Sequence, residues 1–405
     1  MSGIKAAGQY EIIKLHIKSH NGFVMDLRNV MASLEIYEDI YSTSMTARLG
    51  IITTEDLMTV LPIIGQEDVL ISVDHPGGRK QIDLQMIVHK VVGFERDNMS
   101  TKFILELVTQ DYILNFQTKI SQYFEGPSSQ IASQVMSLMG ATKPVAGIAS
   151  DDEQQIVVPN FTAFRTCNWM TEKAYKGSAA DYVFYESKDN YVFAPLSELV
   201  KAAPKIEYKA QPANVVGDPN FEDKIIQSYQ LKSSFDVVQN ILSGMYNTRA
   251  ITVDLITRSF KDISYSFWDE YQNVPHLTNN PLFDISGQGT QYTPANLYVL
   301  PDNPFLTYNH DETNLKRRAQ LQLFNNLKMD LTVFGDTELG SGDTVSLEFP
   351  IFSPLGDGAV NNYLSGNWLV TAIKHRFEQE AYYIDMECVR DSTDKPLPQP
   401  QPVKQ

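Results

Sequence analysis

The strongest constraint on the fold of this chain is the alternation of apolar and polar residues between Leu327 and Arg390. The first segment runs to Phe334 and has an apolar residue at every second position, as in a strand with one buried face. Three further alternating segments follow, and the glycine- and proline-containing stretches between them are typical of turns. No helical periodicity interrupts them. The pattern predicts an antiparallel sheet of four strands that closes as a small barrel.

The segment from Met45 to Thr109 has the same order of features: a strand, a connection, a short strand, a loop, a long strand and a last strand. Phe94 and Phe377 end the two long strands, and an acidic turn follows each of them. A recurrence of this length predicts an internal duplication. Two unrelated sheets of similar size are the alternative.

Between the two sheets the periodicity changes to that of a helix. The stretches "SSQIASQVMSLMG" (128–140) and "FTAFRTCNWMTEKAYKG" (161–177) each carry an apolar stripe at helical spacing. The expected N-caps are Ser128 or Ser129 in the first and Thr162 in the second, and the expected stop signals are Gly140 and Gly177. A hairpin pattern follows at residues 182–196. The chain is therefore predicted to be mainly β, with two similar antiparallel β-barrel domains and an α+β insert of helices and a hairpin.

Composition limits the classes of function. The formal net charge is −16, and general nucleic-acid binding is not expected because phosphate binding needs clustered Lys and Arg. No run of about 18 apolar residues could span a bilayer, and the N-terminal residues lack the apolar core of a signal peptide, so we expect folding in a cytoplasm. Cys167 and Cys388 lie on apolar faces and are predicted to be free buried thiols rather than a disulfide.

The sequence contains no recognisable catalytic, metal-binding or cofactor-binding site. It lacks the CxxC, HExxH and GxSxG motifs and a phosphate-binding glycine loop. His89 and His375 each lie within a long strand, where a hydrogen-bonded strand residue is the simplest interpretation. A pair of catalytic carboxylates stays an open alternative because the chain has 49 acidic residues, but no local motif indicates one. We expect no enzymatic activity and no cofactor.

Several stretches together resemble the baseplate hub family of contractile-tailed bacteriophages. They occur in the order of that family and extend over nearly the whole chain, whereas each motif alone is weakly specific. The stretches are "DLRNVMASLEIYEDIYSTSMTARLGI" (26–51), "LPIIGQED" (61–68), "DYVFYESKDNYVFAPLSELV" (181–200), "NLKMDLTVFGDTELGSGDTVSLEFP" (326–350) and "LSGNWLVTAIKHRF" (364–377).

The resemblance implies a structural protein of the virion: a homotrimeric ring with two similar barrels per chain and hence six nearly equivalent sectors. Such a ring joins the hexameric tail tube protein to the central spike protein, contacts other baseplate proteins and leaves a channel for genomic DNA. It is assembled in the cytoplasm of the host bacterium. The hub half of type VI secretion spike proteins shares this design. The alternatives are another tail or secretion-system structural protein with tube-like barrels, or a cell-wall hydrolase on a two-barrel scaffold.

The resemblance also divides the chain into parts, of which the accessory domain lies on the outside. Its second part contains residues 275–313, which are rich in Asn, Pro, Gly and Thr and are predicted to form long surface loops. The expected parts are the first barrel (1–118), the accessory domain (119–221 and 263–315), the second barrel (222–262 and 316–392) and a Pro/Gln-rich tail (393–405).

The tail has Pro at alternate positions, which predicts an extended and semi-rigid segment. We expect it to dock on the spike or on a neighbouring baseplate chain, because a stiff segment loses little entropy on binding. A solvated end that touches nothing is the alternative. The expected partner-binding residues are Lys395, Pro396, Pro398, Pro400 and Pro402.

Overall fold

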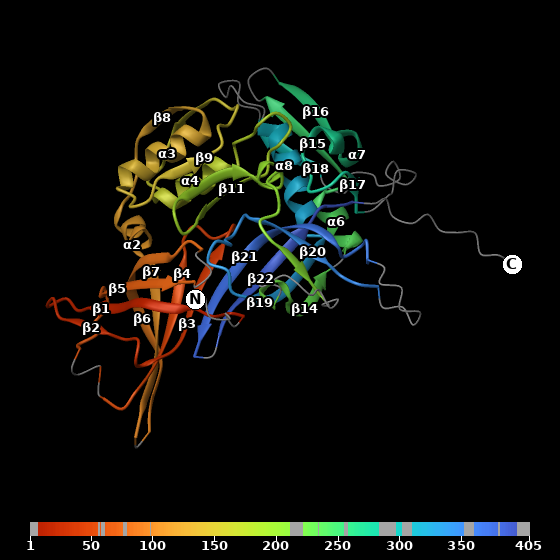
Figure 1. Ribbon diagram of the computed structural model, residues 1–405. Helices are drawn as coiled ribbons and strands as arrows, with labels where there is room; N and C mark the ends of the chain where they lie inside the picture. Colours follow the sequence, from red (N-terminus) through yellow and green to blue (C-terminus); the bar gives the residue numbers. More distant parts are fainter. Residues whose placement is uncertain are drawn as a thin grey trace.

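The computed structural model contains one large sheet of 13 strands, which lies below a group of smaller sheets and helices in the view of Figure 1. The structure describes residues 7–55, 57, 61–75, 79–97, 99–210, 222–233, 235–254, 258–282, 297–301, 310–351, 360–379 and 381–394. The first set of strands in the large sheet is β1 (Glu11–Lys18), β2 (Val24–Asp26), β3 (Met31–Asp39), β4 (Thr46–Thr53), β5 (Asp68–Asp74), β6 (Ile82–Arg96) and β7 (Thr101–Thr109). The second set is β13 (Glu207–Lys209), β14 (Ile226–Ser233), β19 (Leu327–Phe334), β20 (Thr344–Glu348), β21 (Gly366–Glu378) and β22 (Tyr382–Arg390).

The two sets contain the same arrangement of four strands. Their order is β4–β7–β6–β5 in the first set and β19–β22–β21–β20 in the second. The long strands have a register shift at the same place, after Val88 in β6 and after Val370 in β21. The strands next to β4 and β19, which are β3 and β14, also have matching shifts, after Met31 and after Ile226. The shared strand order and these shared shifts confirm the predicted duplication, although β6 and β14 each have a second shift, after Val92 and after Leu231, that β21 and β3 lack.

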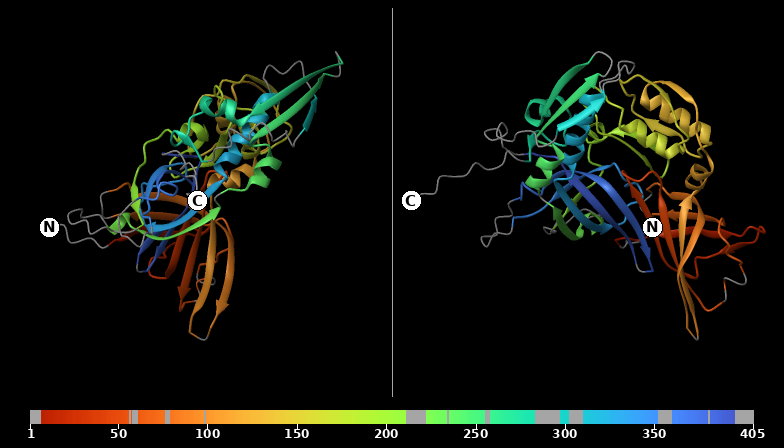
Figure 2. Two further views of the ribbon diagram at one scale, coloured as in Figure 1. Left: turned by 90° about the vertical axis from the view of Figure 1, so that its right-hand side faces the viewer. Right: turned by 180° about the vertical axis from the view of Figure 1, so that it is seen from behind.

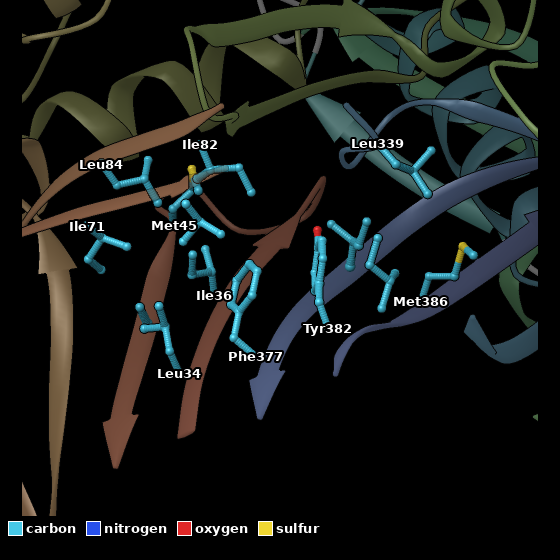
Figure 3. Packing of buried hydrophobic residues seen from close by; sticks show 14 of the residues in the cluster. Leu34, Ile36, Met45, Ile71, Ile82, Leu84, Leu339, Phe377, Tyr382 and Met386 are labelled. Carbon is cyan, nitrogen blue, oxygen red and sulfur yellow. The ribbon is translucent and has the colours of Figure 1, made fainter. Parts of the chain in front are cut away.

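The two sets are joined edge to edge, because β21 pairs with β3 in antiparallel orientation. The sequence patterns did not predict this connection. One buried cluster contains side chains from both sets, and Figure 3 shows Phe377 of β21 beside Leu34 and Ile36 of β3. The ring of Phe377 stacks on Tyr382 with 4.3 Å between centroids. Burial of each side chain of this size contributes about 1.5–3 kcal/mol, so the junction is part of the folded core.

The helix-and-hairpin insert follows β7. Both predicted helices are present: α3 ends at Gly140, whose φ of +78° favours glycine, and α4 is capped by the hydroxyl of Thr162, which accepts from the backbone N–H of Arg165. The N-cap of α3 is Pro127 and not Ser128 or Ser129 as predicted, and helix α4 ends at Thr171, before the predicted stop at Gly177. The insert consists of α2 (Gln110–Gln117), β8 (Tyr123–Gly126), α3 (Ser128–Met139), β9 (Val145–Gly147), β10 (Gln154–Val157), α4 (Ala163–Thr171), β11 (Tyr182–Glu186), β12 (Tyr191–Pro195) and α5 (Leu196–Leu199).

A third group of elements surrounds the long helix α8. Strand β15 pairs with β16 and β18 in a sheet separate from the large one. Arg317 of α8 donates to the carbonyl oxygens of Thr171 (2.9 Å) and Tyr182 (2.7 Å) and so attaches this group to the insert. The group consists of α6 (Val237–Ser243), β15 (Asn247–Asp254), β16 (Ser259–Ser266), α7 (Phe267–Glu270), β17 (Asn280–Pro281), β18 (Leu297–Pro301) and α8 (His310–Phe324). The short elements η1 (Glu222–Lys224), η2 (Tyr271–Asn273) and β23 (Ser392–Thr393) complete the chain.

The prediction of long loops for residues 275–313 was wrong where the structure describes them as β18 and the first turn of α8. Strand β18 is a short apolar segment that pairs in parallel with β15. Because a parallel partner lies far away in the sequence, the local pattern could not reveal it. None of the described helices is long and apolar enough to cross a bilayer.

Candidate assembly interface

The junction between β21 and β3 has one polar face and one core face. The ladder places Arg376 opposite Glu35 on the polar face and Phe377 opposite Leu34 on the core face. The ammonium of Lys374 lies 4.0 Å from a carboxylate oxygen of Glu35. Opposite charges across a ladder contribute only about 0.2–1 kcal/mol each. The apolar face therefore carries most of the stabilisation of this junction.

A buried polar cluster lies within the core of the junction. Glu38 of β3 and His375 of β21 have completely buried side chains, and Nε2 of His375 lies 3.3 Å from Oε1 of Glu38. The other ring nitrogen of His375 lies 2.6 Å from the hydroxyl of Tyr382. Lys188, in the β11–β12 hairpin, lies 4.0 Å from the same Glu38 oxygen and donates to the carbonyl oxygen of Leu339 at 2.7 Å. The cluster thus connects the two strand sets and the insert.

Burial governs the protonation of this cluster. Burial lowers the pKa of His375, which favours the neutral imidazole. Burial alone would raise the pKa of Glu38, but His375 and the charge of Lys188 hold it below its usual value. Burial also lowers the pKa of Lys188, and the charge of Glu38 opposes that effect. At neutral pH the lowered pKa values favour a carboxylate at Glu38 and a neutral imidazole at His375.

The duplicated fold leaves two open edges that correspond to the two joined ones. Strand β14 takes the place in the second set that β3 takes in the first, and among the described strands it pairs with β19 only. Residues 90–95 of β6 correspond to the part of β21 that pairs with β3. Among the described strands, these residues of β6 pair with β7 alone. The open edge of β14 is therefore equivalent to the edge of β3, and the open edge of β6 is equivalent to the edge of β21.

Exposure of apolar side chains marks both open edges. Tyr229 and Leu231 of β14 are each 40% exposed, whereas the corresponding residues of β3, Leu34 and Ile36, are 0% exposed. The difference arises because β21 covers β3. On the other open edge, Phe94 of β6 is 52% exposed. The β6–β7 hairpin that carries it extends beyond the rest of the sheet (Figure 2, orange). Open edges of this kind are sites for strand pairing with another chain.

The polar face of the joined sheet lines a hollow of about 910 Å³, which α2 borders through Tyr112. Among the described residues, six Asp and Glu side chains and two Lys and Arg side chains line the hollow, and some of them form ion pairs. Arg48 lies 3.0 Å from Glu106, and Lys374 lies 2.8 Å from Asp385. Burial alone would raise the pKa of Asp385, but Lys374 and a hydroxyl donor hold it below its usual value. The described lining therefore presents paired charges rather than the clustered cations that bind phosphate.

The candidate residues from the sequence have different outcomes. His375 is the hydrogen-bonded strand residue expected, whereas His89 is exposed beside the ring of Tyr112. Cys167 and Cys388 are free and buried, as predicted. In the described part of the chain, no three His, Cys, Asp or Glu residues are grouped to hold a metal. The predicted partner-binding residues lie outside the described residues and stay a prediction: Lys395, Pro396, Pro398, Pro400 and Pro402.

Sequence reasoning missed the buried cluster. The available signal was a charged residue at a core-facing position, since Glu38 continues the series of Leu34 and Ile36 at every second residue of β3. A buried carboxylate requires a partner. Its partners, Lys188 and His375, come from distant parts of the chain and could not be identified from spacing.

No protein-family model matches the chain. Over an alignment of 425 residues it is 21% identical to the "Probable baseplate hub protein gp334" of Vibrio phage KVP40, and the alignment covers 95% of each chain. A 43 kDa tail protein of prophage MuSo2 from Shewanella oneidensis has a TM-score of 0.57 at 12% identity, with 94% of this chain and 99% of that chain covered. A tail protein from Neisseria meningitidis MC58 has a TM-score of 0.57 at 9% identity, with 94% and 97% covered. The resemblance to baseplate hub proteins is confirmed, and the fold is that of phage tail proteins.

Proposed function

We propose that this protein is the structural hub of a contractile phage-tail baseplate and forms a homotrimeric ring of pseudo-sixfold symmetry. The ring joins the hexameric tail tube to the trimeric central spike and contacts other baseplate proteins. It acts in the virion after assembly in the cytoplasm of the host bacterium. The baseplate hub and tail proteins that resemble this chain support a structural role in a tail.

The observation that carries this proposal is the pair of complementary open edges. Within the chain, β3 extends the sheet of the second set by pairing with β21. Between chains, β14 of one copy extends the sheet of the next by pairing with β6 in the same way. An interface of this head-to-tail kind generates a ring when the rotation closes. Three copies place six similar strand sets around one axis, which matches the symmetry of a hexameric tube.

The polar face of the joined sheet is proposed to line the channel for genomic DNA. Its paired charges favour passage of DNA over binding, because tight binding of phosphates requires clustered cations. We propose the two barrel domains at residues 1–118 and at 222–262 with 316–392, and the accessory domain at 119–221 and 263–315.

The tail of residues 393–405 is proposed to bind the spike or a neighbouring baseplate chain through Lys395, Pro396, Pro398, Pro400 and Pro402. Deletion of residues 395–405 should reduce co-purification of the protein with the spike. Unchanged co-purification would identify the tail as a solvated end.

The protein is proposed to have no enzymatic activity. The support is the structural role named for its relatives, together with a sequence that lacks nucleophile–base and metal-binding motifs. We expect no turnover in a turbidity assay on cell-wall material. Turnover that is abolished by replacement of one carboxylate would establish a hydrolase instead.

The ring is tested by the substitution Leu231→Asp, which places a charge on the open edge of β14. Val157→Asp is the matched control, because Val157 is 66% exposed on β10 of the insert. Native mass spectrometry and negative-stain images should show three-chain rings with a central hole for the wild type and for Val157→Asp. Leu231→Asp should be monomeric. A wild-type protein that stays monomeric would contradict the proposed ring.

A further inference from the structure

Helix α6 follows the open edge strand β14 and exposes an apolar stripe. Val238 and Leu242 are 67% and 59% exposed, and their spacing of four residues places them on one side of the helix, while Phe235, just before the N-cap Asp236, is 65% exposed. Asn240 is on the opposite side and is completely buried, and its amide donates to Oδ1 of Asn326 at 2.6 Å. The helix is therefore fixed to its own chain through Asn240, and the stripe faces away from that contact.

A second exposed apolar surface lies beside the other open edge. Helix α2 follows β7, the strand that pairs with β6. Phe116 of α2 is 60% exposed, and its ring packs edge-on against the ring of Tyr112 with 5.0 Å between centroids. In Figure 1, α2 and α6 lie on the same side of the large sheet, near its two opposite ends. A head-to-tail contact between copies brings those two ends together.

The internal junction determines which residues of the open edges would meet. Tyr37 of β3 lies opposite Lys374 of β21. In the first set Tyr37 pairs with β4, and in the second set Ser233 pairs with the equivalent position of β19. Ser233 of β14 therefore corresponds to Tyr37. The residue of β6 that corresponds to Lys374 is Val92, which lies the same distance after the register shift. The repeat therefore places Ser233 of one copy opposite Val92 of the next.

Continuation of this ladder brings α6 to α2. Two residues beyond Ser233, Phe235 comes opposite Lys90, and α6 then continues along β6 past its register shift. The imidazole of His89, at that shift, lies 6.4 Å from the ring of Tyr112 on α2. The position where α6 begins is therefore the position where α2 lies on the neighbouring copy.

We propose that α6 of each copy packs on α2 of the next copy, so that the stripe containing Val238 covers the aromatic pair containing Phe116. This inference rests on the proposed ring and adds a second contact to the strand pairing. The contact is apolar on both sides, so that each surface excludes water from the other. It also connects the insert of one copy to the third group of its neighbour, outside the sheet itself.

The test uses full-length variants in native mass spectrometry over a series of protein concentrations. Val238→Glu and Phe116→Lys each place one charge in the apolar contact. Each should raise the protein concentration at the monomer–ring midpoint by about tenfold or more. The combined variant places opposite charges together in every interface and should restore assembly. Leu138→Glu is the matched control, because Leu138 is 54% exposed on α3, and it should assemble as the wild type does.

The outcomes separate this contact from the ring itself. If Leu231→Asp prevents assembly while Val238→Glu and Phe116→Lys assemble normally, the helix contact is refuted and the ring stands. If both single variants weaken assembly and the combined variant does not recover, the two side chains do not face each other and the inference is refuted. A monomeric wild type refutes the ring and the contact together.

Discussion

Replacement of Lys188 by methionine tests the buried cluster at the junction of the two strand sets. The substitution keeps an unbranched side chain, shorter by one heavy atom, and removes its charge. Glu38 would then be a completely buried carboxylate whose remaining neighbours are the neutral His375 and the backbone N–H of Ser341 at 3.4 Å. Loss of one partner of a buried ion pair costs about 3–5 kcal/mol. We expect the free energy of unfolding of Lys188→Met to fall by this amount.

Urea unfolding at neutral pH, followed by tryptophan fluorescence, measures this change as a lower midpoint. Lys205→Met is the control, because Lys205 pairs with Asp343 at 2.8 Å but is 49% exposed, and a pair of that kind contributes about 1 kcal/mol or less. The double variant Lys188→Met/Glu38→Gln removes the uncompensated charge. It should recover most of the stability lost in Lys188→Met.

Equal losses for Lys188→Met and Lys205→Met would refute the reasoning, because the buried carboxylate would then not depend on its cation. A double variant no more stable than Lys188→Met would refute it as well. In that case the loss would come from packing or from the hydrogen bonds of Lys188 to carbonyl oxygens, such as that of Leu339.

Three other substitutions or treatments test separate features. Burial alone would lower the pKa of His276, but its 2.7 Å contact with Asp391 raises it, and a raised pKa stabilises the folded state at low pH. Protection of the amides around β17, corrected for the base-catalysed intrinsic exchange rate, should therefore fall as the pH rises above 6.5, and this fall should be absent in His276→Gln. Burial raises the pKa of the Cys167 and Cys388 thiols, so a maleimide should label them only after unfolding; labelling of the native protein would contradict this. Trp368→Ala should lower the free energy of unfolding by about 3–5 kcal/mol in urea titrations, because this side chain is completely buried; a loss below about 1 kcal/mol would be inconsistent with its packing.

The face of each strand was decided by the sequence itself. Leu327, Met329, Leu331 and Val333 alternate in the sequence with polar residues, and in β19 the same four are buried while their neighbours are half-exposed. Successive side chains of a strand point to opposite faces, so the pattern alone determines which set is buried. The end of a helix was also determined by the local sequence, as the stop of α3 at Gly140 shows. The duplication was also visible, because equal spacing of equal elements is preserved in the linear sequence.

Only the tertiary structure decided which strands became neighbours across the two sets. Residues 31–39 and 372–378 have ordinary strand patterns, and nothing in either segment identifies the other as its partner. The same holds for Lys188, whose role depends on the approach of Glu38 from a distant strand. Strand pairing uses backbone N–H and C=O groups that nearly every residue carries, so the partner of an edge is selected by packing over the whole molecule and not by local sequence.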